Sequence, residues 1–593
     1  MAQLRIALAQ VNPTVGDLAG NADLVVEWTG RAAAEGAHLV AFPEMMLTGY
    51  PIEDLALRKS FVDASLETLG NTARRLAGEG LGELPVIVGY LDRRSDIEPQ
   101  VGMPAGAPQN AAALVHRGRV LARYAKHHLP NYGVFDEYRY FVPGDRLPIF
   151  RLHGIDVATV ICEDLWQEGG PVSVIREAGA QLMVVINGSP YERNKDDVRL
   201  ELAARQAQEA GAALAYVNMV GGQDELVFDG DSLIVDAAGE LIARGEQFAE
   251  DLLVADLDLT RVEGLLAVGE APVDAADGTT MTVERLLISD DPPPPYQQEP
   301  RPYAQRLDDL EEVYAALVTG TRDYARKNGF ESVILALSGG IDSSLTATVA
   351  TDALGPKRVH AVLLPSHYSS EHSVTDAEDL VKRQGIHGRT VPIAGIVDAF
   401  GEEIDLHGVA AENLQARVRG MIIMSLSNEH GHLVLTTGNK SELATGYSTL
   451  YGDSAGGFAP IKDVLKTTVW QLARWRNAQA DARGETPPIP ENSITKPPSA
   501  ELRPGQLDTD SLPAYDVLDP LLDDYVERDM GRDALVAAGH DPALVDRVIR
   551  LVDAAEYKRR QYPPGPKITP KNFGRDRRLP ITSRWRGSVT PPR

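Results

Sequence analysis

A proline-rich interruption at residues 292–295 constrains the fold more than any other feature, because it divides a chain that otherwise alternates apolar strand-like runs with helical periods. Proline cannot continue a helix or a central strand. At 593 residues, the chain is also longer than a single hydrophobic core usually serves. We therefore predict a domain over residues 1–263, a connection over residues 264–301 and a second domain over residues 302–593.

The N-terminal part has the pattern of a layered α/β domain. Short apolar runs predict strands, apolar residues at three- and four-residue spacing predict a helix, and a turn at residues 236–239 predicts a hairpin. The predicted strands cover residues 4–11, 37–42, 86–91, 157–161, 182–186 and 213–218, the helix covers residues 61–76, and the hairpin strands cover residues 226–235 and 241–244.

The C-terminal part alternates strands with helices, which is typical of a doubly wound parallel sheet. In such a sheet, ligands bind at the carboxyl ends of the strands. One helix is predicted at residues 307–327, and another is predicted to begin at residue 344. The predicted strands cover residues 333–337, 359–364 and 432–435. A mobile proline-rich loop is predicted at residues 486–498.

Charge and cysteine content exclude several classes of protein. The formal net charge of -27 disfavours nucleic-acid partners, because such a field repels a phosphate backbone. The single cysteine, Cys162, rules out an intramolecular disulfide and a thiol-rich metal cage. The N-terminus lacks the pattern of an export signal, and no apolar stretch approaches the roughly 20 residues that cross a bilayer. We expect a cytoplasmic protein without membrane or nucleic-acid partners.

Basic residues crowd in the C-terminal tail, where two interpretations stay open. The segment either balances acidic neighbours at the surface or acts as a lid over a phosphate-rich small molecule. These residues are Lys558, Arg559, Arg560, Lys567, Lys571, Arg575, Arg577, Arg578, Arg584 and Arg586.

Three reactive side chains each follow a strand-like run in the N-terminal part: Glu44, Lys126 and Cys162. If they meet at one rim, Glu44 can take the thiol proton and return it to the leaving ammonia. Lys126 would then favour the thiolate and the developing oxyanion. Taken singly, each has a simpler explanation, because a free cysteine is usually a small buried hydrophobe and lone charged residues are usually solvated ion-pair partners.

The surroundings of these residues resemble the Glu-Lys-Cys triad of the nitrilase superfamily, the carbon–nitrogen hydrolases. The resemblance covers residues 1–258 and rests on Phe42-Pro43-Glu44, on Tyr124-Ala125-Lys126 through Glu137, and on Ile161-Cys162-Glu163-Asp164. It implies a four-layered α-β-β-α sandwich, a thioester intermediate and a second acid, Glu137. It also implies that glutamine is held by Tyr132, Ser189 and Lys195, with Arg193 as an alternative to Lys195.

A glycine-rich loop, Ser338-Gly339-Gly340-Ile341-Asp342-Ser343-Ser344, joins a predicted strand to a predicted helix. Glycines let the backbone approach a phosphate, and amides at a helix N-terminus favour anions. The loop lacks the Gly-Lys-Ser/Thr of kinase and GTPase P-loops. It resembles the pyrophosphate-binding loop of the ATP-pyrophosphatase superfamily, which has an adenine nucleotide alpha hydrolase-like fold. The resemblance implies that Mg²⁺ is held by Asp342 and that ATP is bound by Ser338, Gly339, Gly340, Ile341, Asp342 and Ser343.

Longer strings in the C-terminal part resemble NAD synthetases, and with the tail the match covers nearly the entire chain. The strings lie at residues 365–370, 412–417, 436–453 and 498–504. Matched residue by residue, Thr437 and Lys466 would contact ATP, and Glu442 would bind Mg²⁺. The residues matched to deamido-NAD⁺ are Asn413, Arg417, Tyr447, Ser448, Thr449, Leu450 and Lys558. Leu450 departs from the lysine of ammonia-only relatives, which fits the glutamine-dependent branch.

The resemblance implies a composite reaction and a homo-oligomer. Glutamine would be hydrolysed at Cys162, and the ammonia would cross a protected passage to the second site. There, ATP would adenylate deamido-NAD⁺, and ammonia would convert the adenylate to NAD⁺, with release of AMP and diphosphate. This is the last step of NAD biosynthesis. The resemblance also implies at least a dimer through the synthetase domain.

Three other functions share part of this sequence pattern. A tRNA-thiolating or tRNA-modifying enzyme shares the glycine-rich loop, but such enzymes relay sulfur through cysteines, and this chain has none beyond Cys162. A non-catalytic nucleotide-sensing scaffold is opposed by the intact reactive residues. An amide ligase acting on a purine nucleotide is opposed by the nucleotide-site strings, which favour NAD.

Overall fold

The computed structural model of the chain describes residues 2–95, 102–262, 264, 266–293, 295–297 and 303–585. The chain divides into two compact units: Met1–Gln223 with Phe228–Leu307, and Asp224–Val227 with Asp308–Arg593. None of the helices among the described residues is long and apolar enough to cross a bilayer.

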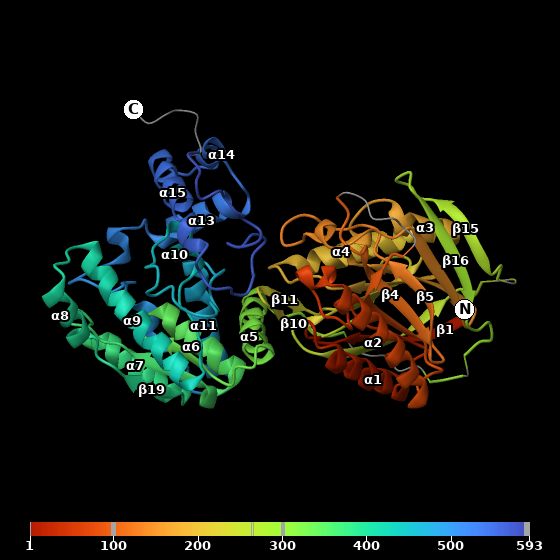
Figure 1. Ribbon diagram of the computed structural model, residues 1–593, viewed down its shortest axis with the longest axis horizontal. Helices are drawn as coiled ribbons and strands as arrows, with labels where there is room; N and C mark the ends of the chain where they lie inside the picture. Colours follow the sequence, from red (N-terminus) through yellow and green to blue (C-terminus); the bar gives the residue numbers. More distant parts are fainter. Residues whose placement is uncertain are drawn as a thin grey trace. The chain divides into compact units, whose positions relative to one another are not determined.

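Two large sheets organise the described part of the first unit (Figure 1). One sheet has the order β14-β1-β2-β3-β4-β5, with strands Asp251–Leu259, Ala2–Gln10, Leu39–Ala41, Val86–Arg93, Pro108–His116 and Arg119–Ala125. The other has the order β13-β12-β9-β8-β7-β6-β16-β15, with strands Leu241–Arg244, Leu233–Val235, Ala213–Asn218, Leu182–Asn187, Ile155–Ile161, Arg146–Leu152, Thr280–Leu287 and Gly269–Asp274. A ribbon pairs β10 (Val220–Gln223) with β11 (Leu226–Asp229).

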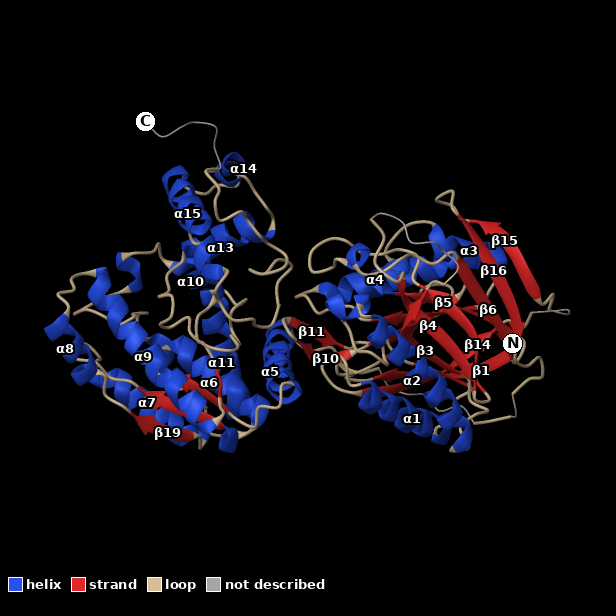
Figure 2. Cartoon of the chain, viewed as in Figure 1, coloured by secondary structure: helices blue, strands red, loops and turns tan. Residues whose placement is uncertain are grey.

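Helices cover the outer faces of both sheets. Helices α1 (Leu18–Ala34) and α2 (Lys59–Gly78) share an apolar core with β1 to β4 and lie along that sheet in Figure 2. Helices α3 (Gly170–Ala178) and α4 (Lys195–Ala210) pack on the other sheet, and a larger core fills the space between the sheets. Because β7, β8 and β9 are buried on both faces, they read as continuous apolar runs. The predicted α-β-β-α sandwich is confirmed.

Two predictions for the first unit need correction. The stretch 264–301, expected to be a connection, contains β15 and β16, and β16 pairs in parallel with β6. These strands were missed because β15 is mostly exposed and lacks an apolar alternation. Leu265, Pro294 and residues 298–301 of that stretch lie outside the described residues. The predicted strand 226–235 is also two strands, since β11 pairs with β10 whereas β12 forms the expected hairpin with β13.

The second unit contains the predicted parallel sheet, in the order β19-β18-β17-β20. Its strands are His387–Thr390, Val359–Leu363, Val333–Ala336 and Leu433–Val434. The described helices α5 to α16 are Asp309–Lys327, Ile341–Leu354, Glu371–Gln384, Ala394–Glu403, Val409–His430, Lys440–Thr445, Lys466–Ala482, Glu491–Thr495, Tyr515–Leu522, Arg532–Ala537, Pro542–Ala554 and Glu556–Arg559.

Helices pack on both faces of this sheet, as the doubly wound prediction requires. One face shares a core with α5, α6 and α7. The other face packs against α9, through Val418 and Ile423. A further cluster joins α10, α13 and α15 into a helical layer beyond the sheet.

The predicted loop at residues 486–498 is partly helical, because it contains α12, in which Ser493 and Ile494 are buried. The prediction was wrong there because flanking prolines hid a short helix. Helix α6 also begins at Ile341, immediately after the glycines, and not at residue 344.

Two basic residues of the tail, Lys558 and Arg559, contact backbone carbonyls elsewhere in the second unit. Lys558 Nζ donates to the carbonyls of Gly446 and Ser448, both at 2.6 Å, and Arg559 donates to the carbonyls of Leu443 and Ala444. These carbonyls lie at the C-terminal end of α10, where cations are favoured. For Lys558 and Arg559, the structure therefore favours a structural role over a lid. Arg586 lies outside the described residues.

Candidate active sites

In the first unit, a reactive side chain follows each of three strands, β2, β5 and β7. Glu44 lies just after β2, Lys126 directly follows β5, and Cys162 directly follows β7. Gly89 on β3 leaves room for the backbone segment that carries Glu44, because a Cβ at Gly89 would clash with the backbone from Pro43 to Met45. All three reactive side chains are buried.

Lys126 lies between two carboxylates. Its Nζ is 2.9 Å from Glu44 Oε1 and 3.0 Å from Glu137 Oε1. The same ammonium and Glu44 both act electrostatically on the buried Cys162 thiol. The structure thus brings together Glu44, Lys126 and Cys162, which were predicted to meet at one rim, and Glu137, the second acid implied by the resemblance.

Burial sets the protonation states of this site. It raises the pKa of the Cys162 thiol well above its ordinary value, and Glu44 adds to the effect while Lys126 opposes it. Burial alone would lower the pKa of Lys126, but Glu137 and Glu44 raise it well above its ordinary value. At neutral pH, the resting site therefore holds a neutral thiol beside an ammonium. The thiol proton has to leave during attack, which requires an adjacent base.

The backbone around Cys162 is also specialised. Cys162 has a φ of 44°, in the left-handed region that non-glycine residues rarely adopt. The adjoining turn is fixed by Asp164, whose carboxylate accepts from the backbone amides of Ile161, His127 and His128 and from the Tyr124 hydroxyl. Asp164 therefore ties the nucleophile turn to the segment that follows Lys126.

Sequence reasoning missed three groups that hold the two acids. Asn110 Nδ2 donates to Glu44 Oε1 at 2.6 Å, and the Gly188 amide donates to Glu44 Oε2 at 2.7 Å. The Tyr50 hydroxyl donates to Glu137 Oε1 at 2.9 Å. Asn110 is a polar residue within β4, a strand that is buried along its whole length. Because a buried amide needs a hydrogen-bond partner, its position could have indicated a contact with another polar group.

The predicted glutamine-binding residues lie at different depths. Ser189 is buried beside Gly188, and its amide donates to Asn218. The half-exposed Tyr132 donates its hydroxyl to Glu163 Oε2 at 2.8 Å, next to the nucleophile. Lys195 begins α4, where its Nζ lies 3.9 Å from Glu192 Oε1. Their role in binding glutamine stays a prediction, as does that of Arg193.

In the second unit, a cavity of about 300 Å³ opens at the carboxyl ends of β17, β18 and β20. This is the edge at which a doubly wound sheet binds its ligands. Most residues predicted to contact ATP line it, and Gly339 does not: the lining includes Ser338, Gly340, Ile341, Asp342, Ser343, Thr437 and Lys466.

The glycine-rich loop needs glycine at one position in particular. Gly339 has a φ of 76°, and a Cβ there would clash with the carbonyl of Ser373 on α7. The loop is braced by its own serines, with Ser343 Oγ 3.1 Å from Ser338 Oγ. The first turn of α6 thus begins directly at the cavity wall.

Two acids converge on one ammonium in this cavity. Lys466 Nζ forms an ion pair with Asp342 and lies 3.7 Å from Glu442 Oε1. Asn439, the N-cap of α10, donates to Asp342 Oδ1 at 2.9 Å. Burial raises the pKa of Glu442 well above its ordinary value, and the nearby Asp342 adds to the effect. Two partly buried carboxylates that share one ammonium favour a bound cation.

Comparison with known proteins separates the two units in the same way. Residues 5–265 match the carbon-nitrogen hydrolase family, and residues 313–562 match the NAD synthase family. The glutamine-dependent NAD(+) synthetase of Thermotoga maritima is 44% identical over 598 residues, spanning 99% of this chain and 100% of the relative. That of Aquifex aeolicus is 41% identical over 592 residues, spanning 98% and 100%. The chain belongs to the glutamine-dependent NAD(+) synthetase family.

A solved structure of a glutamine-dependent NAD⁺ synthetase, from Acinetobacter baumannii in complex with adenosine diphosphate, shares the whole fold. It is 38% identical, has a TM-score of 0.71, and the match covers 99% of this chain and 100% of that chain. The structure of the family member from Cytophaga hutchinsonii is 21% identical with a TM-score of 0.77, and it shows the fold alone.

Of the residues predicted to contact deamido-NAD⁺, some line the cavity and others contact the loop at 446–450. Tyr447 and Thr449 line it. The Thr449 hydroxyl donates to Asn413 at 2.7 Å, and Arg417 Nε donates to the Leu450 carbonyl at 3.3 Å. Lys558 holds the Ser448 carbonyl, so Asn413, Arg417 and Lys558 contact the loop at 446–450 in this structure.

The synthetase cavity also has charged walls that sequence reasoning did not single out. Arg419, Lys496 and Asp508 line it. Lys496 Nζ donates to the Ser373 hydroxyl at 2.9 Å, and the same hydroxyl donates to Glu501 at 2.6 Å. Lys496 stands two residues before the string at 498–504, and this nearness is the signal that could have marked it.

Proposed function

We propose that the two sites divide the family's reaction between them. The first unit hydrolyses glutamine to glutamate and ammonia. The second unit uses ATP to adenylate the carboxylate of deamido-NAD⁺, and ammonia displaces AMP to give NAD⁺. The overall reaction is deamido-NAD⁺ + L-glutamine + ATP + H₂O to NAD⁺ + L-glutamate + AMP + diphosphate. A cytoplasmic location and the absence of nucleic-acid or membrane partners stay predictions from the sequence.

In the first unit, Glu44 takes the Cys162 proton as the sulfur attacks the glutamine amide, and then returns it to the departing ammonia. Lys126 lies beside the thiol, so its ammonium stabilises the thiolate and the oxyanion. Water then hydrolyses the thioester, with Glu44 again acting as base. Asn110 and the Gly188 amide keep the Glu44 carboxylate oriented through both steps.

In the second unit, the turn before α6 and Lys466 receive the phosphates of ATP. The oxygen donors of Asp342 and Glu442 fit Mg²⁺, which would neutralise charge on the departing diphosphate. Lys466 pairs with both carboxylates and so holds them on one side of the cavity. Tyr447 and Thr449 line the part of the cavity that we assign to deamido-NAD⁺.

The observation that carries this proposal is the buried contact of 2.9 Å between Lys126 and Glu44 beside Cys162, in a chain that also has the Asp342–Lys466 cavity. The test is a reaction with ATP, Mg²⁺, glutamine and deamido-NAD⁺, in which all products are quantified. We expect NAD⁺, AMP, diphosphate and glutamate. Formation of ADP in place of AMP, or of NAD⁺ without glutamate, would contradict the proposed chemistry.

Glu137 gives the glutamine-supported reaction a predictable dependence on pH. Burial raises its pKa to about 7, while Lys126 opposes the shift. Glu137 is therefore protonated below that pH and ionised above it, and only the ionised form pairs fully with Lys126. We expect the glutamine-supported rate to fall as the pH drops through about 7. The Glu137→Gln variant should lower this rate by up to about 10²-fold and remove that inflection. The measurement is the rate profile across neutral pH.

The matched control for this profile is the ammonium-supported rate of the same variant, corrected for the fraction of free ammonia. It should equal that of the wild type. An unchanged inflection in Glu137→Gln would assign the titration to another group.

We also infer that the chain forms a homo-oligomer through its synthetase unit. Helix α8 has no buried residue, and it lies beside α9 in Figure 1. Large apolar side chains on and around these helices are exposed in the single chain: Ile396, Phe400, Ile404, Val409, Met421 and Met424. An apolar surface of this kind is typical of an interaction site. The family resemblance makes a second copy of this chain the partner.

We expect the purified chain to have a mass in solution of at least twice 64.2 kDa. Because a buried carboxylate is costly, Phe400→Glu should shift the equilibrium toward the monomer. Light scattering coupled to gel filtration measures both masses. The matched control is Val268→Glu, which places the same charge at an exposed apolar residue of the other unit. Equal masses for Phe400→Glu and the wild type would place the interface elsewhere.

A further inference from the structure

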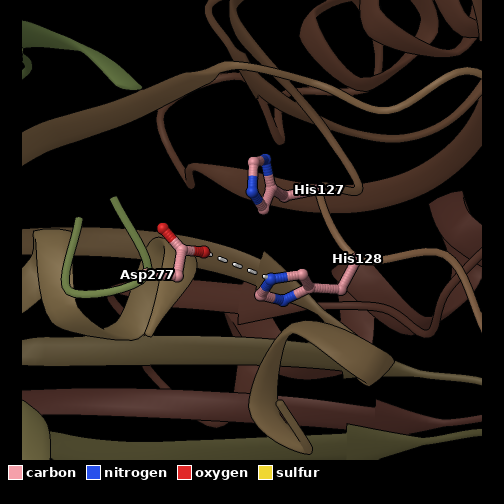
Figure 3. A group of neighbouring side chains, drawn as sticks. All are labelled: His127, His128 and Asp277. Atoms are coloured by element: carbon pink, nitrogen blue, oxygen red, sulfur yellow. Dashed lines mark ion pairs between the residues drawn. The ribbon is translucent and has the colours of Figure 1, made fainter. Parts of the chain in front are cut away.

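Two histidines and an aspartate gather next to the glutaminase site without a role in its chemistry. His127 and His128 directly follow Lys126, and Asp277 lies in the turn between β15 and β16. In the described part of the chain, one ligand atom from each of these residues lies within 4.8 Å of the others. Figure 3 shows the Asp277 carboxylate facing the His128 imidazole, with the His127 imidazole nearby.

The hydrogen bonding of His127 leaves one nitrogen suited to a metal. Its Nδ1 lies 2.7 Å from the Gly144 carbonyl, which can only accept, so Nδ1 carries the proton. The lone pair is then on Nε2. A ring whose Nδ1–H is held by a backbone carbonyl while Nε2 is the ligand is a common arrangement at protein metal sites.

His128 lies between two carboxylates at distances that are too long for hydrogen bonds. Its Nε2 is 3.8 Å from Asp277 Oδ2, and its Nδ1 is 3.8 Å from Asp164 Oδ1. Nδ1 is buried and has no hydrogen-bond partner among the described residues. Buried ring nitrogens are usually satisfied. A metal at Nε2 would give this ring a ligand role, with the proton on Nδ1 facing Asp164 as an outer carboxylate.

We propose that His127, His128 and Asp277 form a binding site for a divalent transition-metal ion of the Zn²⁺ type. Two imidazole nitrogens and one carboxylate oxygen suit Zn²⁺ and related ions, whereas Mg²⁺ and Ca²⁺ prefer oxygen donors throughout. The nearby Asp164 carboxylate adds negative potential. Water completes the coordination, because the site is only partly buried.

Such an ion would connect two parts of the first unit. Asp277 belongs to the β15–β16 turn and accepts from the Gly170 amide at the start of α3. The histidine segment is tied through its amides to Asp164, and so to the turn that carries Cys162. Metal binding therefore clamps the β15–β16 turn onto the segment that holds Lys126. The alternative is a simple ion pair between His128 and Asp277 that holds the turn without any metal.

A metal site and a simple ion pair predict different results in a Zn²⁺ titration of the full-length protein. The protein is first treated with a chelator that is then removed, and the titration is made in the Cys162→Ala background, which lacks the thiol, with excess Mg²⁺ to occupy the carboxylates at Asp342. Isothermal titration and metal analysis after dialysis should give one tight Zn²⁺ per chain. Co²⁺ at the same site should give the visible absorption of nitrogen-ligated Co²⁺. The unfolding temperature of the protein should rise with Zn²⁺.

Asp277→Asn, in an exposed turn, and His128→Gln should each weaken Zn²⁺ binding by at least about 10²-fold and abolish the Zn²⁺-dependent rise in unfolding temperature. The matched control, His372→Gln at an exposed histidine on α7, should bind Zn²⁺ like the parent. Binding of equal affinity in Asp277→Asn and its parent, or no stoichiometric binding in the parent, overturns the proposal. The unfolding temperature without metal checks that each variant is folded.

Discussion

Replacing Cys162 by alanine should lower the glutamine-supported synthesis of NAD⁺ by about 10⁴-fold or more, because removing a nucleophile leaves only the residual contribution of the surrounding site. The same variant should keep the ammonium-supported reaction, since the synthetase cavity lies in the other unit. The two rates are measured on one preparation with ATP, Mg²⁺ and deamido-NAD⁺. The ammonium-supported rate is therefore an internal control for folding.

Cys162→Ala is a mild structural change. The side chain is small and buried, and alanine has no greater difficulty than cysteine with the positive φ at this position. Loss of both activities in a folded variant would contradict the division of labour between the units. Retention of glutamine-supported synthesis would place the nucleophile elsewhere.

Replacing Asp342 by asparagine should lower both the glutamine-supported and the ammonium-supported reaction by about 10²- to 10³-fold, the usual cost of removing one group that stabilises transition-state charge. Asparagine keeps the shape of the side chain and one oxygen, but it loses the charge that pairs with Lys466 and would hold Mg²⁺. Steady-state rates with each nitrogen source measure the effect.

The matched control is Asp352→Asn on the same helix, α6. Asp352 is also an acid paired with a cation, Arg476, but it does not line the cavity. This variant should retain both rates. An Asp342→Asn enzyme that loses only the glutamine-supported rate would show that the acid acts in ammonia supply and not in adenylation.

Most central strands were predictable because they are buried on both faces. β7, β8 and β9 are continuous apolar runs, and their predicted bounds agree with the structure to within two residues. The strands at the sheet edge were not predictable in this way. β15 is mostly exposed and contains Pro272, so its sequence resembles that of a connecting loop. It forms a strand because it pairs with β16.

The reactive residues of the first unit were predictable as candidates, but not their geometry. Glu44, Lys126 and Cys162 each follow a strand, and the resemblance to nitrilases linked them. The contact between Lys126 and Glu44 depends on which strands are neighbours, and no local pattern specifies that. Asn110 was missed because β4 is rich in alanine, a weak strand former, so the strand itself was not recognised.

In the second unit, local motifs predicted the loop at 338–344 and the cavity it lines. They did not predict what several assigned residues would contact. Lys558 of the tail and Arg417 of α9 bind backbone carbonyls of the loop at 446–450, because both segments pack against this loop in the folded unit. Such long-range contacts follow from tertiary packing and leave no periodic signal in the sequence.

The central claim is that nitrogen released at Cys162 becomes the amide nitrogen of NAD⁺ made in the other unit. The most direct measurement supplies wild-type protein with glutamine labelled with ¹⁵N in its amide, together with unlabelled ammonium, and determines the label in NAD⁺ by mass spectrometry. We predict labelled NAD⁺ from the wild type and unlabelled NAD⁺ from Cys162→Ala. Unlabelled NAD⁺ from the wild type, despite release of glutamate, would contradict the account.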